Sequence, residues 1–365
     1  MELILANLKT IFIFTAVLSI LVIVHEWGHF ITARKLGVQV ERFSIGFGPK
    51  LFSKVHAGTE FMVCLIPLGG YVKMAGDVRG ECQGKPGEFY AKSPGLRSLI
   101  VLNGPVVNYI LAYVCLMLVF VLGYPDISSK VGELMEGYPA EEAGLQTGDQ
   151  IIEIEGQKIE SWSQLQSNIA NSKNKEIHIG FLRDGREMAR TVTLKVERMK
   201  NVFGQYKEIK LMGIHPTEEM VALKYSFLTA GAMAFKKLYE ITALTYKSIY
   251  FMLTGAMSAK ETMTGPIGIF FIVKHAAEMG FSYLLFIVGI ISASLAIFNL
   301  LPVIPLDGGH LFLFAVEKLR GKAFSAKVDE WIARVGFSLI ILLALFVFYS
   351  DFERFGWIEK IRHLF

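Results

Sequence analysis

Residues 11–29 read IFIFTAVLSILVIVHEWGH and join a long apolar segment directly to two histidines and a glutamate. The apolar segment covers residues 3–24 and is broken mainly by Asn7 and Lys9. A helix needs about 20 apolar residues to cross the hydrocarbon core of a bilayer. No Lys or Arg precedes Lys9 and no small-residue cleavage site follows, so we expect a retained membrane span and not a cleaved signal peptide.

Three further apolar segments lie at residues 99–123, 281–301 and 335–349. We expect the last and shortest to extend back to Trp331, because long side chains at a helix end can reach the headgroup region. Charged residues make up 19% of the chain, against about 25% in an ordinary soluble protein. We therefore predict a multi-span α-helical membrane protein with about four transmembrane helices.

Lys and Arg concentrate in two loops, one between the first and second spans and one between the third and fourth. They are Arg34, Lys35, Arg42, Lys50, Lys54, Lys73, Arg79, Lys85, Lys92 and Arg97 in the first loop, and Lys318, Arg320, Lys322, Lys327 and Arg334 in the second. Because positively charged short loops stay in the cytoplasm, both loops should be cytoplasmic. Four spans then place both termini and the polar region 124–216 outside.

The polar region 124–216 has the pattern of a small β-rich domain. Apolar residues alternate along residues 176–182, and the Asp-Gly within residues 183–186 favours a tight hairpin turn before a further strand at 188–196. Residues 162–170 predict a helix that Ser161 caps. About ninety residues suffice for independent folding.

Residues 220–255 are apolar and aromatic but interrupted by several lysines, with apolar positions at roughly helical spacing. An amphipathic helix in the membrane interface would have this pattern. A helix packed on the soluble domain would have it too, and the sequence leaves both interpretations open.

The remaining composition excludes other classes of site. The net charge of +4 is small and no basic block with interleaved aromatic residues occurs, so no nucleic-acid partner is expected. The three cysteines, Cys64, Cys82 and Cys115, form no C-x-x-C pair. Neither a thiolate zinc site nor a disulfide framework is therefore expected.

His25 and His29 are four residues apart, so on a helix they lie on one face about one turn apart. Two imidazoles in that arrangement can bind one zinc ion, and Glu26 can take a proton from a bound water. The alternative interpretation is that this His-Glu-x-x-His pattern is a chance match at a helix end. Since catalytic zinc needs three protein ligands and one open position, a third ligand must come from elsewhere in the chain.

Asp307 is the best candidate for that ligand, because it directly follows the third apolar segment in the run NLLPVIPLDGGH, residues 299–310. Pro, Asp and Gly-Gly are also ordinary helix stop signals. The predicted topology nevertheless places both histidines and Asp307 at cytoplasmic ends of their spans, where they can meet. His310 is a less favoured alternative, since it lies beyond a flexible Gly-Gly.

These motifs resemble the site-2 protease family of intramembrane zinc metalloproteases, most closely its bacterial RseP-type branch. The resemblance covers essentially the whole chain. It rests on HEWGH at 25–29, the run from Asn299 to Asp307-Gly308-Gly309, a soluble domain inserted between the second and third spans, GFGP at 46–49, PLGGYVKMAGD at 67–77 and GPIG at 265–268. The family pattern N-x-x-P-x-P-x-x-D-G is matched at Pro302, whereas Pro305 stands one place late.

The resemblance implies a hydrolase with one catalytic zinc held by His25, His29 and Asp307, with Glu26 as the base. It also implies a membrane-associated β-region after the first span. We expect Gly69 and Gly70 of that region to supply a sheet edge for an unwound substrate. Asn299 and Pro302 are expected to contact that substrate as well.

The soluble region resembles a single bacterial PDZ domain through YPAEEAGLQTGD at residues 138–149, whereas close relatives often carry two. Such a domain either excludes untrimmed substrates or binds an exposed C-terminus, and the sequence does not choose. The resemblance implies regulated intramembrane proteolysis in the bacterial inner membrane, with the active site towards the cytoplasm. Substrates would be single-span proteins such as anti-sigma factors, or remnant signal peptides.

The expected organisation has nine parts. They are a first transmembrane helix (1–33), a cytoplasmic-side β-region (34–96), a second transmembrane helix (97–123), the PDZ-like domain (124–216), an interfacial connector (217–278), a third transmembrane segment (279–309), a cytoplasmic loop (310–330), a fourth transmembrane helix (331–350) and a tail (351–365). Two rival functions are a membrane adaptor with a vestigial metal site and a metal transporter. The intact motif disfavours the first, and the glutamate beside His25 disfavours the second.

Overall fold

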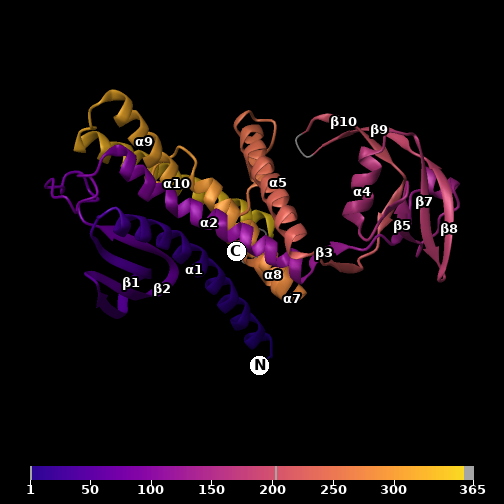
Figure 1. Ribbon diagram of the computed structural model, residues 1–365, viewed down its shortest axis with the longest axis horizontal. Coiled ribbons are helices and arrows are strands. Elements are labelled where there is room, and N and C mark those ends of the chain that lie inside the picture. The colour runs from indigo at the N-terminus through magenta and orange to yellow at the C-terminus, as the bar shows by residue number, and fades with distance from the viewer. Residues whose placement is uncertain (1, 202–203, 357–365) are drawn as a thin grey trace, which may run out of the picture. The chain divides into compact units, whose positions relative to one another are not determined.

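Four long apolar helices dominate the computed structural model, which describes residues 2–201 and 204–356 (Figure 1). They are α1 (Glu2–Lys35), α2 (Pro94–Leu122), α8 (Phe281–Asn299) and α10 (Ala326–Arg354). Each is long and apolar enough to cross a membrane, so the predicted four spans are confirmed for the described residues. The helix α10 begins five residues before Trp331, where the Ser325 hydroxyl accepts a hydrogen bond from the Val328 N–H.

The shorter elements lie between these helices. In chain order they are β1 (Val40–His56), β2 (Thr59–Met74), β3 (Tyr124–Ile127), β4 (Val131–Leu134), α3 (Pro139–Glu142), β5 (Gln150–Ile154), β6 (Gln157–Lys158), α4 (Trp162–Asn171), β7 (Glu176–Arg183), β8 (Arg186–Thr193), β9 (Lys195–Lys200), β10 (Tyr206–Leu211), β11 (Ile214–Pro216), β12 (Met220–Leu223), α5 (Phe227–Leu253), α6 (Ala259–Thr262), α7 (Pro266–Met279) and α9 (Asp307–Arg320).

The chain divides into two compact units. The membrane unit comprises residues 1–116, 234–247 and 258–365, and the inserted unit comprises residues 117–233 and 248–257. The helices α1, α7, α8, α9 and α10, most of α2 and the β1–β2 sheet belong to the membrane unit, and each unit has a hydrophobic core of its own.

In the membrane unit, β1 and β2 bend so that each contributes two segments to one antiparallel sheet. Residues 42–45 of β1 pair with 60–63 on one side and with 70–73 on the other, which makes 70–74 an outermost strand. The bend in β1 needs glycine, because Gly46 has a φ of 87° and a Cβ there would lie 2.5 Å from the Ile66 carbonyl oxygen. This sheet is the predicted β-region, and the glycines of GFGP at 46–49 shape it.

Two clusters of buried side chains hold the membrane unit together. In one, Leu21 of α1 packs with Val273 of α7 and Ile287 of α8. In the other, Ala33 of α1 packs with Ile100 of α2 and Phe314 of α9, beside the start of β1. Four helices far apart in the sequence, α2, α7, α8 and α9, therefore pack against the middle and the C-terminal end of α1.

The inserted unit contains a four-stranded antiparallel sheet in the order β6–β5–β7–β8. Its core includes Leu165 of α4, Ile177 and Phe181 of β7 and Val192 of β8. The predicted helix and its cap are confirmed, since the Ser161 hydroxyl accepts from the Gln164 N–H at the start of α4. The single strand expected at 188–196 is wrong, because the chain forms β8 and β9 on either side of Leu194.

Two connecting regions are largely helical, as the sequence pattern indicated for residues 220–255 but not for residues 310–330. The segment expected as an interfacial connector includes the 27-residue helix α5, which exposes Leu228, Phe235 and Tyr239. Its middle part joins the membrane unit, where the Thr242 hydroxyl lies 2.6 Å from that of Tyr109 on α2. Residues 310–330, expected as a loop, hold most of α9.

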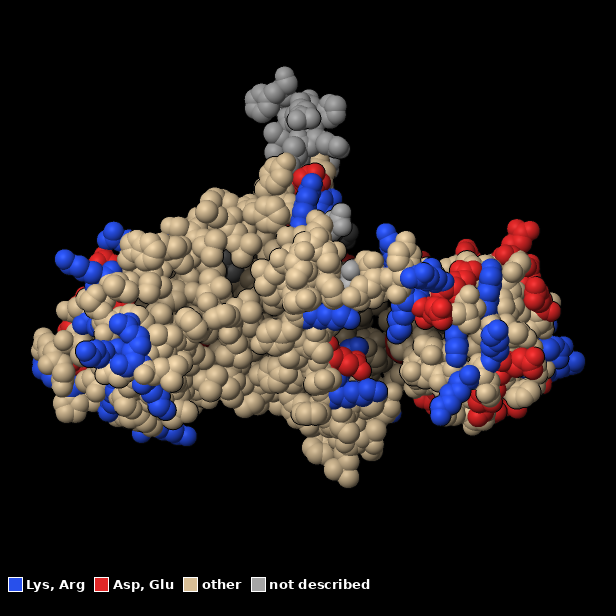
Figure 2. All heavy atoms as spheres, turned by 90° about the horizontal axis from the view of Figure 1, so that it is seen from above, with Lys and Arg blue, Asp and Glu red and all other residues tan. Residues whose placement is uncertain are grey.

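Charged side chains are unevenly distributed on the surface shown in Figure 2. A broad stretch of the helical part of the membrane unit shows no charged side chains, while Lys and Arg gather at the end that carries β1, β2 and α9. The inserted unit carries both signs over its visible face. This distribution fits a chain with one apolar body in lipid and a basic end in water.

Candidate metal centre

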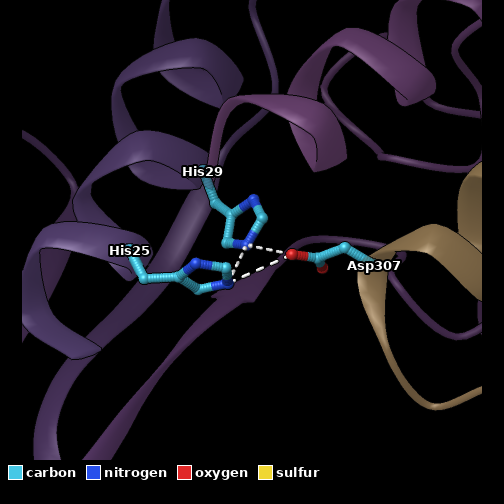
Figure 3. A group of neighbouring side chains, drawn as sticks. All are labelled: His25, His29 and Asp307. Atoms are coloured by element: carbon cyan, nitrogen blue, oxygen red, sulfur yellow. Dashed lines mark hydrogen bonds and ion pairs between the residues drawn. The ribbon is translucent and has the colours of Figure 1, made fainter. Parts of the chain in front are cut away.

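His25 and His29 lie one turn apart on α1, and both are buried with 8% of their surface exposed. Their Nε2 atoms are 3.2 Å apart, and the two ring planes are almost perpendicular, at 88°. The two imidazoles therefore present nitrogen atoms to a common point, as the i, i+4 spacing predicts. Figure 3 shows both rings pointing towards Asp307.

Asp307 comes to that point because α8 ends at Asn299 and α9 begins at Asp307. The seven residues between the two helices fold back on the first turn of α9. Only glycine fits beneath this turn, since a Cβ at Gly308 would lie 2.2 Å from the Leu300 carbonyl oxygen and one at Gly309 would lie 2.6 Å from the Ile304 nitrogen. The Gly308-Gly309 pair therefore has a packing role that the stop-signal interpretation did not include.

The three side chains form a compact donor set. Asp307 Oδ2 lies 3.1 Å from His25 Nε2 and 3.5 Å from His29 Nε2. Among the described residues, no other group of three or more His, Cys, Asp or Glu side chains meets so closely. His310 is not a member, so the alternative third ligand that the sequence left open is not supported by the geometry.

This set fits a tetrahedral zinc ion. Zinc bonds of about 2.0–2.2 Å separate tetrahedral ligand atoms by about 3.3–3.6 Å, close to the three separations here. Asp307 Oδ2 is buried and accepts no conventional hydrogen bond. Neutral imidazole lone pairs directed at one carboxylate oxygen would repel it, so the arrangement requires a cation or a proton at its centre.

Charge on the acidic ligand is favoured by its surroundings. Asp307 Oδ2 lies 3.1 and 3.5 Å from the Nε2 atoms of His25 and His29, so a proton or a metal ion held by either imidazole stabilises the carboxylate. A carboxylate rather than a carboxylic acid is the form that binds a metal. The nearby His310 behaves differently, since burial lowers its pKa and keeps it neutral.

The second transmembrane helix lies against the two imidazoles. A Cβ on Gly104 of α2 would be 2.4 Å from both Cε1 and Nε2 of His29, and one on Gly28 of α1 would be 2.4 Å from the Asn103 carbonyl oxygen. Small residues at such a crossing let two membrane helices approach closely. The sequence reasoning missed Gly104, although a glycine inside an apolar span is a signal of close helix contact.

Close approach of α2 also orients one imidazole. His29 Nδ1 lies 3.0 Å from the Ile100 carbonyl oxygen. An N–H on Nδ1 that donates to this oxygen leaves Nε2 as the lone-pair nitrogen facing Asp307. The backbone of α2 therefore selects the tautomer in which His29 can bind a metal.

Glu26 lies beside the donor set and is not part of it. A Cβ on Gly70 would be 3.7 Å from Glu26 Cγ, so the outermost strand of the β1–β2 sheet passes next to this side chain. The turn before that strand is tied to α1, because the Ser19 hydroxyl donates to the Pro67 carbonyl oxygen. The acid, the donor set and a sheet edge thus share one location.

The remaining predicted residues are close in the chain to these elements. Gly69 has a φ of 106° and packs on the Phe47 ring, which explains glycine at the bend before Gly70. Asn299 is the last residue of α8 and is half-buried, whereas Pro302 is exposed in the following turn. Their contact with a substrate stays a prediction.

Most of this chain is similar to known proteins. Residues 13–343 match the family model described as peptidase family M50. A Campylobacter jejuni protein whose name assigns it to the zinc metalloproteases is 33% identical over 341 residues, covering 93% of this chain and 92% of its own. The regulator of sigma-E protease RseP of Escherichia coli is 28% identical, with 93% and 98% covered.

Two further proteins are similar to this chain or to part of it. The zinc metalloprotease RasP of Oceanobacillus iheyensis is 26% identical, and the alignment, which includes gaps, covers 95% of this chain and 99% of that protein. The solved PDZ domain of an SdrC-like protein from Listeria monocytogenes matches 24% of this chain and 86% of its own, at 20% identity and a TM-score of 0.20.

Proposed function

The chain belongs to peptidase family M50, the site-2 zinc metalloproteases, and from this premise we propose that it cleaves single-span membrane proteins within the bilayer at His25, Glu26, His29 and Asp307. The observation that carries the proposal is the convergence of two imidazole nitrogens and one carboxylate oxygen beside the Glu26 side chain. Three ligands leave one coordination position open, as a catalytic zinc site requires.

In this proposal His25, His29 and Asp307 hold the zinc ion. The bound ion supplies Lewis acidity for activation of water and polarisation of the scissile carbonyl. Glu26 takes the proton of the attacking water and returns it to the leaving nitrogen. The helices α1, α2 and α9 keep bulk water from the ligands by burying both histidines.

A helical substrate must unwind first, because all of its backbone carbonyls are paired. The outermost strand at residues 70–74 offers backbone groups to an extended peptide next to Glu26. We infer that Gly69 and Gly70 place this edge and that the Asn299 amide holds the opened strand from the other end. Pro302 would shape the same entrance.

The topology in the proposal places the metal centre towards the cytoplasm and the inserted unit outside, in a bacterial inner membrane. The basic end of the membrane unit, which carries β1, β2 and α9, supports this orientation. Cysteine labelling on intact cells tests it, with the native cysteines replaced. Lys173→Cys in the inserted unit should react with an impermeant maleimide, whereas Lys85→Cys should react only after permeabilisation.

The inserted unit is proposed to act as a PDZ-type domain that controls access of substrates, on the strength of its residues 138–149. Anti-sigma factors and remnant signal peptides are the proposed substrate classes. The strands β3 and β12 pair with each other where the chain enters and leaves this unit, with Ile127 opposite Met220. Replacing residues 128–219 with an Asn-Gly turn would therefore keep the strand pair.

That deletion separates the two possible roles. If the domain excludes untrimmed substrates, cleavage of proteins with bulky external domains should increase. If it recruits an exposed C-terminus, cleavage of trimmed substrates should be lost. Both outcomes are measured with one single-span reporter prepared with and without a folded external domain.

The decisive experiment on the function is Glu26→Gln, with Glu81→Gln as the control on an exposed acid. We expect Glu26→Gln to retain zinc and lose cleavage of a single-span reporter, while Glu81→Gln retains both. A chelator should abolish wild-type cleavage, and zinc should restore it. Cleavage that survives in Glu26→Gln would exclude the proposed base, and absence of zinc from the wild type would favour an adaptor.

A further inference from the structure

Asn108 of α2 is completely buried, and its side-chain amide faces the ring of His25. The amide nitrogen Nδ2 lies 3.5 Å from His25 Nδ1. The amide oxygen Oδ1 has no hydrogen-bond partner among the described residues, although it is buried. A buried acceptor without a partner is unfavourable, so this orientation of the amide needs an explanation.

The protonation of a metal-bound imidazole explains the orientation of the Asn108 amide. When Nε2 of a neutral histidine binds a metal, Nδ1 carries the proton and acts as a donor. The Asn108 NH2 group would then face another donor. Oxygen and nitrogen of a side-chain amide are assigned from the hydrogen-bond network, and a half-turn about the last bond exchanges them. After the exchange, Oδ1 accepts from His25 Nδ1–H and is no longer unpaired.

The second imidazole shows the same arrangement with a backbone acceptor. His29 Nδ1 faces the Ile100 carbonyl oxygen, which lies on α2 two turns before Asn108. One helix therefore provides a partner to the Nδ1 atom of each histidine. The backbone at Asn108 is itself held, because the Ser292 hydroxyl of α8 donates to the Asn108 carbonyl oxygen at 2.8 Å.

We propose that Asn108 is a positioning residue whose side-chain oxygen accepts a hydrogen bond from His25 Nδ1–H and so directs His25 Nε2 to the metal. The inference rests on the proposed function, since it takes His25 as a zinc ligand. Partners of this kind set the tautomer and orientation of metal-binding histidines. Asn108 touches neither the substrate nor the reacting atoms and acts only through His25.

The test measures zinc affinity of the detergent-solubilised full chain by competition with a chromophoric chelator. Asn108→Leu removes the acceptor and should weaken zinc binding by about 10–100-fold. Asn108→Asp has nearly the same shape but can only accept, so its affinity should stay close to the wild type. Asn103→Leu is the matched control, because the Asn103 amide on the same helix donates to the Gly28 carbonyl oxygen and not to an imidazole.

The outcomes separate this inference from the function on which it rests. If wild type binds zinc and His25→Ala does not, the metal site stands. An affinity of Asn108→Leu equal to that of Asn103→Leu, or an Asn108→Asp protein as weak as Asn108→Leu, would then overturn the role of Asn108 alone. If Asn108→Leu does not fold, Asn108→Asp alone tests the proposal. A side chain that had to donate a hydrogen bond to His25 would lose zinc affinity on replacement by Asp, whereas an accepting side chain would keep it. Zinc binding that His25→Ala leaves unchanged would overturn both.

Discussion

Arg97 Nη2 at the start of α2 lies 2.6 Å from Glu317 Oε1 on α9, and only 2% of the Arg97 surface is exposed. The guanidinium also lies over the rings of Tyr90 and Phe314, at 5.1 and 4.6 Å from their centroids. Glu317 accepts a further bond from Arg79, at 2.8 Å. Because Asp307 begins the helix that carries Glu317, this buried pair anchors the helix of the third metal ligand to α2.

Removing one member of the pair should destabilise the membrane unit. Glu317→Ala leaves the Arg97 charge buried without its carboxylate, which costs about 3–5 kcal/mol in comparable buried pairs. Lys318→Ala on the exposed side of the same helix is the control and should change stability by less than about 0.5 kcal/mol. Denaturation in detergent measures both, and equal stability of the two variants would contradict an anchoring role.

The same carboxylate should make stability depend on pH. Burial opposes its charge, but hydrogen bonds from Arg97 and Arg79 outweigh it and lower the pKa of Glu317 below the usual 4.5. A lowered folded pKa contributes stability that is fully present above the unfolded pKa and is lost as pH falls through the folded one. Wild type should therefore lose more thermal stability below pH about 4.5 than Glu317→Gln does. Parallel pH curves for the two proteins would exclude this contribution.

A methyl group at Gly104 should disturb the metal centre directly. Gly104→Ala places a Cβ 2.4 Å from His29 Nε2, so either the imidazole or α2 must move. Overpacking of this kind costs about 1–3 kcal/mol, and we expect it to appear as weaker zinc binding and slower cleavage. Gly95→Ala on the same helix meets nothing within 4 Å and should be neutral or slightly stabilising. Chelator competition compares the two, and matching affinities would rule out the predicted clash.

Loss of the Asn299 amide should affect the substrate and not the metal. Asn299 ends α8 eight residues before Asp307 and does not belong to the donor set. If its amide holds the opened substrate strand, Asn299→Ala loses about one hydrogen bond and about tenfold in kcat/KM. Zinc content is the internal control and should be unchanged. Undiminished cleavage would remove Asn299 from the proposed substrate site.

Features that depend on neighbours in the chain could be predicted from the sequence. Long apolar segments indicate the four spans because a helix has a defined rise per residue, and His25 and His29 share a face because the helix repeats every 3.6 residues. The capping of α4 by Ser161 is equally local. The strand boundaries around Leu194 were harder to predict. Alternation of apolar residues does not show that β8 pairs with β7 whereas β9 pairs with β10.

Features that depend on distant contacts could not be predicted in this way. Asp307 was proposed as the third ligand from topology and resemblance, but nothing in its neighbourhood places its Oδ2 atom 3.1 Å from His25. The Arg97–Glu317 pair joins residues 220 positions apart. No periodic pattern encodes such a separation, because it results from how the helices pack.

By itself, therefore, the sequence determined the membrane class, the helical pairing of His25 with His29, and two candidates for the third ligand, Asp307 and His310. Only the tertiary structure decided which of these two completes the donor set and which groups of α2 face the two Nδ1 atoms. The physical reason is that helix periodicity positions side chains along one element. Close packing at Gly28 and Gly104, with the fold of residues 300–306 over Gly308, sets the distances between elements.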